Sequence, residues 1–500
     1  MLFFILCLLI TFTIRIIPYN STFLKEPDEY VYSLIVQKSI LTNNLNNPTS
    51  WTDLTVKPSF YTEKPLLILI PEYFSMITSL SVFQTFNLLG PLLFLLCFIA
   101  FYLYSNTLLE NKYYALLSAL IFSVVLASLF HTVAGEWRGE ELTITFMLFD
   151  LLLINKIFSS TIFKRIEFIL LFLTMTFLYF SWNGAIFSLL ILMYTIFIFV
   201  FWNISTKIFK KDWNFFFPII TTITIILGVL VVFIFFKNYQ IGSLSVISET
   251  TSPSILFLLA STGFLIIPLL FIFLILCRKT IRLPKTPTEY SFMILALACI
   301  FLGLQQERFI IFLMIPLAIL ITMCIKIAFS GQNKTAKTFS KYFLILVLPS
   351  IILYSFFFSF SLQPADNINT NFYSALYYLK NNTSANATVM SLWPDGSVIE
   401  NIAQRRVYSD SMAGGLDLPQ FAQFLYAKYG NFTYLYQMNV SYLLVRRYWL
   451  LENQTILSYI HTNISFNNTN FYHLVVLNES NNNLSVFFKN NDSTIYEVKK

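Results

Sequence analysis

Long apolar runs separated by short polar connections fill the first 361 residues of the chain. A helix that crosses a bilayer needs about 20 apolar residues. Eleven runs have or approach that length, and their pattern predicts a polytopic α-helical membrane region over residues 1–361. The runs lie at 1–17, 86–105, 114–131, 142–156, 166–182, 185–203, 215–236, 254–277, 290–303, 309–327 and 342–361.

A further apolar run, 65–84, contains Pro65, Pro71 and Glu72. A charge at the bilayer centre costs about 2.5 to 3.5 kcal/mol on insertion scales. We therefore expect this run to lie in the interface or to re-enter the membrane rather than to span it.

The composition changes at residue 362, where the chain becomes rich in Asn, Tyr and Ser. This tail of residues 362–500 is long enough for one domain. Helical periodicity alternates there with β-branched and aromatic runs, which predicts a mixed α/β fold. The expected helices cover 372–380 and 418–429, and the expected strands cover 440–445, 471–477 and 484–488.

With 57% hydrophobic and 11% charged residues and a mean hydropathy of +0.69, the chain is too apolar for a soluble globular protein. Its net charge of +7 is carried by short basic clusters in alternate loops, which indicates membrane topology rather than nucleic-acid binding. Those loops are expected to be cytoplasmic. Loops 18–85, 132–141 and 237–253 and the tail 362–500 are then extracytoplasmic, as in a multi-pass protein of the plasma membrane.

Acidic residues stand at the external edges of the predicted spans, although the chain has few charges. Asp28 follows Glu26 and Pro27 in the first loop, Glu136 and Glu140 lie in the second, and Glu249 lies in a later one. Each is readily explained as a solvated loop charge. Carboxylates that converge on one face are also what Mg²⁺ and Mn²⁺ require, because both ions prefer oxygen ligands.

Arg308 begins a predicted span at its external edge. Such an arginine commonly extends its charged end to the membrane surface. Its planar donor fork also suits a phosphate ligand.

Residues 391–400 follow the last span by about thirty positions and read Ser-Leu-Trp-Pro-Asp-Gly-Ser-Val-Ile-Glu. Pro394, Asp395 and Gly396 favour a tight turn, in which Asp-Gly supplies positive-φ positions. The segment is either an ordinary surface turn or part of a recognition site.

In sequence order, these motifs resemble those of the catalytic subunit of oligosaccharyltransferase, in particular the short archaeal dolichyl-phosphooligosaccharide-protein glycotransferases. Residues 26–28 resemble the first acidic motif, whose final Asp binds metal, and residues 132–140 resemble the second. Residues 246–249 are similar to the motif whose Glu contacts the acceptor asparagine. Arg308 resembles the arginine that meets the lipid diphosphate, and residues 392–396 stand where the family carries Trp-Trp-Asp-Tyr-Gly.

The resemblance implies a GT-C type glycosyltransferase that transfers an oligosaccharide from a dolichyl or polyprenyl diphosphate to the Asn side chain of Asn-x-Ser/Thr in acceptor polypeptides. It implies a transmembrane catalytic domain, 1–361, and an extracytoplasmic acceptor-recognition domain, 362–500, without an obligate partner subunit. Asp28 and Glu249 are the expected catalytic pair. Asp28, Glu140 and Glu249, with Glu136 as a further candidate, would hold Mn²⁺ or Mg²⁺, and Arg308 would bind the diphosphate.

The acceptor sequon is expected to contact Glu249 and the segment composed of Leu392, Trp393, Pro394, Asp395 and Gly396.

The chain departs from the family pattern in three places. Arg138 stands where the second motif has its first acidic residue, so Glu136 or Glu141 replaces that ligand or water does. Either Pro394 fills the Asp position of the tail signature, or Asp395 keeps that role with a shift of one residue. The eleven predicted spans compare with thirteen in the family.

Other polyprenyl-phosphate glycosyltransferases, such as protein O-mannosyltransferases or lipid-modifying transferases, also fit acidic residues in the first external loop. They do not predict the tail signature at 392–396. A transporter would instead show charged or broken helices at mid-membrane, often in two related halves.

Overall fold

The computed structural model describes residues 1–19, 23–25, 27–42, 65–129, 132–159, 165–181, 185–208, 253–263, 266–277, 286–362, 368–408, 418–450 and 465–499. The chain divides into two compact units. Met1–Tyr19 and Leu88–Leu362 form what we call the helical unit, and Asn20–Asn87 and Gln363–Lys500 form the mixed unit. We expected the first loop to belong with the membrane domain, but the structure groups it with the tail.

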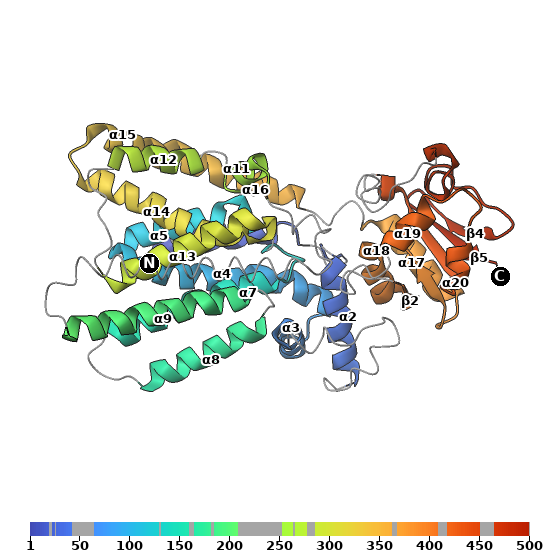
Figure 1. Cartoon of the computed structure of the whole chain (residues 1–500), viewed down its shortest axis with the longest axis horizontal. Coiled ribbons are helices and arrows are strands. Elements are labelled where there is room, and N and C mark those ends of the chain that lie inside the picture. The colour runs from blue at the N-terminus through green and yellow to red at the C-terminus, as the bar shows by residue number, and fades with distance from the viewer. Residues whose placement is uncertain are drawn as a thin grey trace. The chain divides into compact units, whose positions relative to one another are not determined.

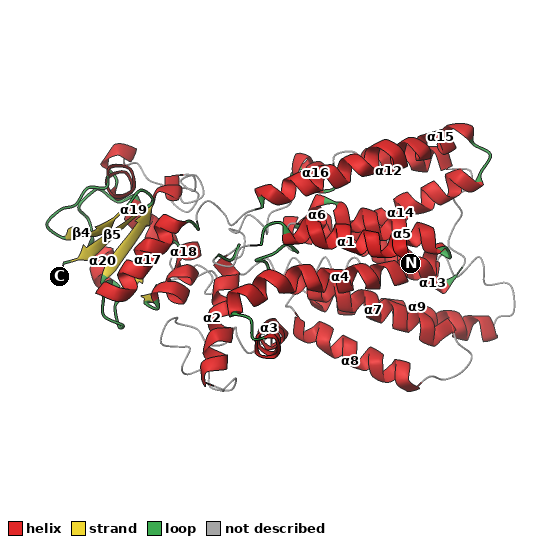
Figure 2. Cartoon of the chain, turned by 180° about the vertical axis from the view of Figure 1, so that it is seen from behind, coloured by secondary structure: helices red, strands yellow, loops and turns green. Residues whose placement is uncertain are grey.

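The helical unit is built from apolar helices that run alongside one another (Figures 1 and 2). Ten of the eleven predicted spans correspond to described helical segments, and the run 215–236 lies outside the described residues. The helices are α1 (Leu2–Ile16), α4 (Val82–Leu109), α5 (Lys112–Val124), α6 (Leu126–Leu129), α7 (Gly139–Ser159), α8 (Arg165–Ser181), α9 (Ala185–Ile208), α11 (Ile255–Ser261), α12 (Ile266–Cys277), α13 (Pro287–Gln305), α14 (Ile310–Ser330), α15 (Lys334–Tyr342) and α16 (Leu348–Ser361).

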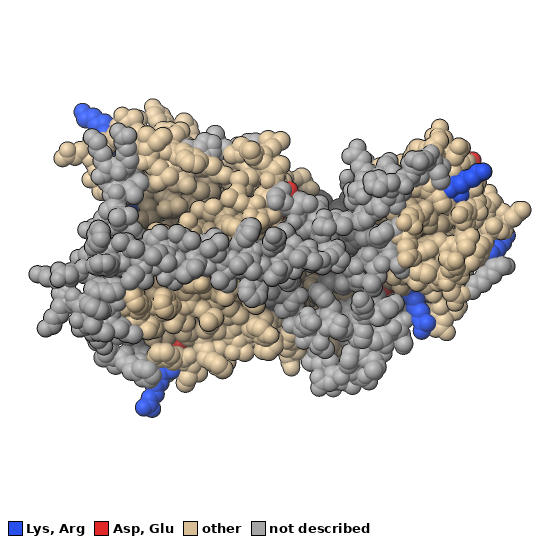
Figure 3. Space-filling model, viewed as in Figure 1, with Lys and Arg blue, Asp and Glu red and all other residues tan. Residues whose placement is uncertain are grey.

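Among the described residues, five helical segments are long and apolar enough to cross a membrane: Val82–Leu109, Ala185–Trp202, Pro287–Gln305, Ile310–Ser330 and Lys334–Ser361. The last is α15 and α16 joined by the π-helical turn Phe343–Val347. Large apolar side chains such as Phe172 of α8, Phe271 of α12 and Phe357 of α16 are exposed on the outside of the unit. Few charged residues interrupt its described surface on the face in Figure 3. An exposed apolar surface of this kind is what lipid covers, so the chain is a multi-pass membrane protein.

The predicted span 254–277 is divided in the structure, because α11 ends at Ser261 and α12 begins at Ile266. Gly263, between the two helices, has φ +76°, a left-handed conformation that glycine adopts without steric cost.

The mixed unit contains a five-stranded sheet with strand order β2-β1-β3-β5-β4. Its strands are β1 (Thr388–Met390), β2 (Arg406–Val407), β3 (Tyr442–Arg446), β4 (Leu484–Lys489) and β5 (Ser493–Val498). β1 lies parallel to both β2 and β3, whereas β5 pairs antiparallel with β3 and with β4. The tail therefore has the mixed α/β fold that its sequence predicts.

The helices of the mixed unit are α2 (Pro27–Thr42), α3 (Pro65–Thr78), α17 (Thr370–Asn382), α18 (Trp393–Val398), α19 (Leu418–Leu425) and α20 (Thr433–Gln437). Short helical turns cover Ile399–Ala403, Arg447–Leu450, Phe466–Asn468 and Tyr472–Leu477. The strand predicted over 471–477 is wrong, because this segment is a π-helical turn that buries Leu474 and Val475 against the sheet's core. Core packing overrides the β propensity of its branched residues.

The run 65–84 starts with α3, whose 14 residues extend about 21 Å at 1.5 Å per residue. This length is too short to cross a hydrocarbon core of about 30 Å. Its buried Glu72 accepts a hydrogen bond of 2.8 Å from the Ser39 hydroxyl of α2. α3 therefore lies against α2, and its position in the interface or as a re-entrant segment stays a prediction.

Candidate functional site

The second acidic segment lies at the start of α7, within the helical unit. Glu136 and Arg138 lie in the loop before the helix, and Glu140 and Glu141 lie in its first turn. All four side chains are buried, with Arg138 the most accessible at 9%. Acidic side chains in a first turn are stabilised by the helix dipole. Burial of so many charges in so apolar a chain indicates a constrained site rather than a solvated loop.

Arg15, near the end of α1, holds the segment that leads into this loop. Its Nε donates to the Thr132 hydroxyl at 2.8 Å, and its Nη2 donates to the Ser128 carbonyl at 3.1 Å. The guanidinium carbon lies 3.4 Å from the centre of the Phe94 ring. The Ala134 amide donates in turn to the Arg15 carbonyl at 2.9 Å. The side chain and the backbone of one buried residue therefore both fix the loop.

Gly90 of α4 packs against the same loop from another side. A Cβ at this position would lie 2.5 Å from the Glu136 carbonyl oxygen and 3.0 Å from that of Val133. Only a residue without a side chain allows α4 to approach the loop backbone this closely.

Contacts within the helical unit place two further elements relative to this loop. The Arg15 contacts place the loop before α7 at the end of the helical unit where α1 terminates. At the opposite end, the Thr288 hydroxyl at the start of α13 donates to Asn155 near the end of α7, at 2.8 Å. α13 therefore runs back toward the start of α7, and the turn Glu307–Phe309 that follows it, with Arg308, lies at the same end as Glu140.

The first acidic segment lies in the mixed unit. Asp28 and Glu29 occupy the first turn of α2, where Asp28 is half-buried and Glu29 is buried. α2 packs against α18 and the turn Ile399–Ala403, which are elements of the tail. The helix that carries Asp28 and the tail signature are thus brought together in one compact unit.

The tail signature forms a helix, and the tight turn predicted for residues 393–396 is wrong. α18 starts after Leu392 with Pro394 in its first turn, where a missing N–H costs nothing and the fixed φ suits a helix. The amides of Asp395 and Gly396 both donate to the Leu392 carbonyl, at 3.0 and 3.3 Å. Gly396 does not adopt a positive φ.

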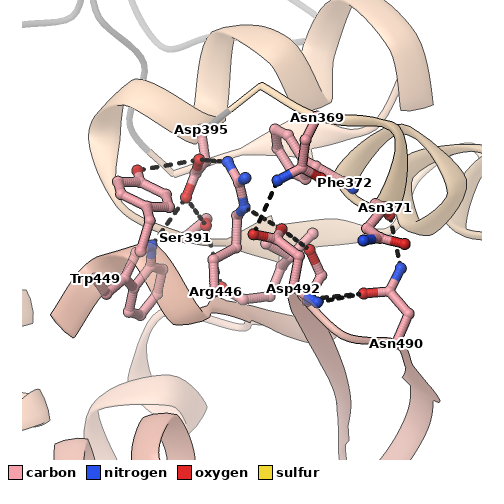
Figure 4. Close-up of polar contacts among 12 residues, drawn as sticks. Asn369, Asn371, Phe372, Ser391, Asp395, Arg446, Trp449, Asn490 and Asp492 are labelled. Carbon is pink, nitrogen blue, oxygen red and sulfur yellow. Dashed lines mark hydrogen bonds and ion pairs between the residues drawn. The ribbon is translucent and has the colours of Figure 1, made fainter. Parts of the chain in front are cut away.

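Asp395 is the centre of a buried polar network (Figure 4). Its Oδ1 accepts from Arg446 Nη1 at 2.8 Å and from the Tyr448 hydroxyl at 3.1 Å. Its Oδ2 accepts from Trp449 Nε1 at 3.0 Å and from the Ser391 hydroxyl at 3.2 Å. A carboxylate has about four lone-pair positions. Arg446, Tyr448 and Trp449 fill three of them, and the one proton of the Ser391 hydroxyl is shared with the Leu444 carbonyl at 3.0 Å.

Arg446, at the end of β3, connects this network to two other elements. Its Nε donates to Asp492 at 2.9 Å, and its guanidinium carbon lies 3.6 Å from the centre of the Phe372 ring of α17. Burial raises the pKa of Asp395, whereas the charge of Arg446 and the hydrogen bonds oppose that rise. The network therefore connects α18, β3 and α17 through buried contacts.

The structure brings the predicted site residues together only in part. Glu249 and Glu26 lie outside the described residues, and Asp28 and Glu140 belong to different units. Across the part of the chain that the structure describes, no group of three or more acidic, His or Cys side chains forms a metal site.

Sequence reasoning missed three residues: Arg15, which contacts the loop before α7, Asn401, which contacts α2, and Arg446, which contacts Asp395. A signal existed for Arg15, since a charge inside an apolar run is costly and marks a specific role. Neither Arg446 nor Asn401 lies in a recognisable motif, and both are identified by tertiary contacts.

No protein-family model matches the chain, and no curated protein matches it. Among solved structures, it is similar to the Archaeoglobus fulgidus oligosaccharyltransferase tethered to an acceptor peptide with an NVT sequon, with a TM-score of 0.71 and 13% identity over 91% of this chain and 70% of that one. It is also similar to the AglB enzyme of the same organism in complex with an inhibitory peptide and a dolichol-phosphate, with a TM-score of 0.69, 13% identity and the same coverage of both chains.

A more distant similarity is to ArnT from Cupriavidus metallidurans bound to undecaprenyl phosphate, with a TM-score of 0.50 and 12% identity over 99% of this chain and 97% of that one. These similarities establish the fold. The chain shares the fold of these solved structures, with a polytopic helical region and a mixed α/β tail.

Proposed function

We propose that this protein is an oligosaccharyltransferase that moves an oligosaccharide from a dolichyl or polyprenyl diphosphate carrier to the asparagine of Asn-x-Ser/Thr sequons. The observation that carries the proposal is the fold shared with AglB over 91% of the chain. This share is larger than either of the two units, so the similarity extends over parts of both. The substrates named for those structures, a peptide with a sequon and a dolichol-phosphate, fit this activity. The order of acidic and aromatic motifs along the sequence supports it independently.

The reaction requires activation of a poor nucleophile, because the lone pair of an amide nitrogen is delocalised into its carbonyl. Two carboxylates that accept both N–H groups would twist the amide out of conjugation and orient its nitrogen toward the anomeric carbon. We assign these roles to Asp28 and Glu249. The half-buried position of Asp28 at the start of a fixed helix supports its part, since a rigid carboxylate loses little entropy on binding.

The leaving group is a lipid diphosphate, whose charge must be stabilised as the glycosidic bond breaks. We assign Arg308 to its phosphate oxygens, and the position of the Arg308 backbone at the same end of the helical unit as Glu140 supports this assignment. Its planar guanidinium matches phosphate geometry.

We also propose that acidic side chains bind a divalent cation. Asp28, Glu140 and Glu249, with Glu136 or Glu141 in place of the acidic residue that Arg138 displaces, offer carboxylate oxygens, which Mn²⁺ and Mg²⁺ prefer. Such a cation would neutralise developing charge on the diphosphate.

Acceptor recognition is assigned to α18 and the residue before it, that is to Leu392–Gly396, together with Glu249. Asp395 accepts hydrogen bonds from Arg446, Tyr448 and Trp449 inside the mixed unit, which supports a positioning role for this carboxylate. Pro394 is half-buried beside it, and its position in the first turn supports contact with the sequon. A pocket built for a hydroxyl rejects acceptors that lack it.

The protein would act at the plasma membrane with its mixed unit on the extracytoplasmic face, where secreted acceptors emerge. The basic clusters that the sequence places in alternate loops support this orientation.

The test uses the purified full chain, a lipid-linked oligosaccharide, Mn²⁺ and a peptide containing Asn-x-Thr. We expect a glycopeptide by mass spectrometry, and no product when Gln replaces Asn in the same peptide. Absence of transfer across archaeal dolichyl and bacterial polyprenyl donors would refute the proposal.

The similarity to ArnT favours a second candidate, the transfer of a sugar from a polyprenyl phosphate to a lipid acceptor. The same preparation separates the two functions when a glycolipid acceptor replaces the peptide. A labelled lipid without labelled peptide would select this alternative.

A further inference from the structure

The mixed unit holds the helix of the first acidic motif with side chains from the tail. Asn401 lies in the turn Ile399–Ala403 that continues α18, and its side chain is buried. Its Nδ2 donates to the Tyr30 carbonyl and to the Ser33 hydroxyl, both at 2.7 Å. The Ser33 hydroxyl donates in turn to the Tyr30 carbonyl at 3.0 Å. One amide group therefore contacts two residues of α2 that lie three positions apart, about one and two turns from the start of the helix.

A second contact fixes the same part of α2 from α17. The hydroxyls of Tyr30 and Tyr373 are 2.8 Å apart, and both side chains are buried. The Leu24 amide donates to the Tyr30 hydroxyl at 3.1 Å, so the chain just before α2 is held at the same point. Tyr30 is two residues from Asp28, so these contacts with the tail hold α2 close to that carboxylate.

The elements that make these contacts are themselves joined by buried side chains. α18 and its continuation are bound to β3 through Asp395 and Arg446, and α17 lies against Arg446 through Phe372. Asn401 therefore links α2 to elements that buried contacts hold to one another.

We propose that Asn401 is a positioning residue that couples the tail signature helix to Asp28. It holds the first turns of α2 at a fixed distance from α18, so that an acceptor bound by the tail meets a carboxylate already in place. The role of Asp28 in this coupling rests on the proposed function, whereas the mechanical link between Asn401 and α2 does not.

Asn470 provides a matched control. It is also a buried Asn of the tail, and its Nδ2 donates to the Phe424 carbonyl at 2.9 Å and to the Asn431 carbonyl at 3.1 Å. Both acceptors lie inside the tail, and the Asn470 Oδ1 also accepts from the Gly430 amide at 3.1 Å. Asn470→Ala therefore removes three hydrogen bonds within the tail and none of those printed for Asn401 on α2.

The test is hydrogen–deuterium exchange of the full-length protein in detergent, read at the backbone amides of α2. We expect Asn401→Ala to raise exchange there about tenfold, because a net 1.4 kcal/mol from two buried hydrogen bonds corresponds to a factor of 10. Asn470→Ala should leave α2 at the wild-type rate. Equal α2 exchange in wild type and Asn401→Ala, or equal increases in both variants, would overturn the proposal.

If Asn401→Ala unfolds the tail, the coupling is tested instead by changing Ser33, the residue of α2 that Asn401 contacts. Ser33→Ala lies on α2, and we expect it to raise α2 exchange severalfold while the strands of the tail keep their protection. Unchanged α2 exchange in Ser33→Ala would count against the coupling.

An activity measurement then tests the catalytic consequence. We expect Asn401→Ala to lower kcat for the sequon peptide about tenfold with a smaller change in KM, whereas Asn470→Ala changes both little. A loss confined to KM would refute the effect on Asp28. Absence of transfer by the wild-type protein would refute the proposed function and leave the exchange result intact.

Discussion

The carboxylate of Asp395 and the guanidinium of Arg446 form an ion pair of 2.8 Å with both side chains almost fully removed from solvent. Removing one partner of a buried pair leaves an uncompensated charge and costs about 3 to 5 kcal/mol. We therefore expect Asp395→Ala to lower the thermal midpoint of the tail by several degrees or to prevent its folding. Tryptophan emission and circular dichroism measure this change.

Asp492→Asn is the control for this prediction. It keeps a carbonyl acceptor for Arg446 Nε, so the loss of stability should be much smaller. If Asp395→Ala folded normally but transferred sugar equally to Asn-x-Thr and Asn-x-Ala peptides, Asp395 would be a recognition residue rather than a positioning one.

Arg15 and Glu141 interact electrostatically inside the helical unit. Both carboxylate oxygens of Glu141 are buried and accept no hydrogen bond from any residue that the structure describes. We expect Arg15→Met to destabilise the protein strongly, because it leaves this carboxylate without compensation. The double variant Arg15→Met/Glu141→Gln should be more stable than Arg15→Met alone in thermal unfolding in detergent. Additive effects of the two substitutions would show that the residues are not coupled.

Gly90→Ala should disturb the second acidic segment more than it disturbs the fold. The added methyl group would meet two backbone carbonyl oxygens of that loop, which move only if the loop moves. We expect transfer activity to fall at least tenfold with a small change in thermal midpoint.

Gly331→Ala is the comparison for Gly90→Ala, since its added methyl would lie 3.0 Å from the Ile327 carbonyl oxygen, at the end of α14 far from the loop. It should keep its activity. Equal loss in the two variants would remove the special role of Gly90.

Arg138 tests how the protein compensates for the missing acidic residue of its second motif. We expect Arg138→Asp to lower the Mn²⁺ concentration needed for half-maximal transfer, because it adds an oxygen donor and removes a repelling charge. Glu140→Gln should raise that concentration. The measurement is a Mn²⁺ titration of transfer rate, and an unchanged titration in both variants would place the cation elsewhere.

The proposed orientation predicts opposite labelling of two exposed positions. Asn386, in the tail, and Lys337, in α15, both have exposed side chains. In intact cells, a membrane-impermeant thiol reagent should label Asn386→Cys but not Lys337→Cys. Labelling of Lys337→Cys alone would show that the protein has the opposite orientation in the membrane.

The sequence by itself determined the large-scale architecture, because a bilayer requires each spanning helix to be a continuous apolar run that can be recognised in the sequence. The spans follow from run lengths, since the cost of exposing a polar group to lipid is incurred residue by residue. The mixed α/β character of the tail followed from alternating periodicities, although the order of its strands did not.

Only the tertiary structure decided what the polar residues do. The segment Trp393–Val398 is a helix rather than a turn. A proline near its start is compatible with both a turn and a helix, and the buried hydrogen-bond partners of Asp395 favour the helix. Arg446 lies 51 positions along the chain from Asp395, and Asn401 lies 368 positions from Ser33. Hydrogen bonds act over about 3 Å, so contacts between residues so distant in sequence exist only once the fold has brought them together.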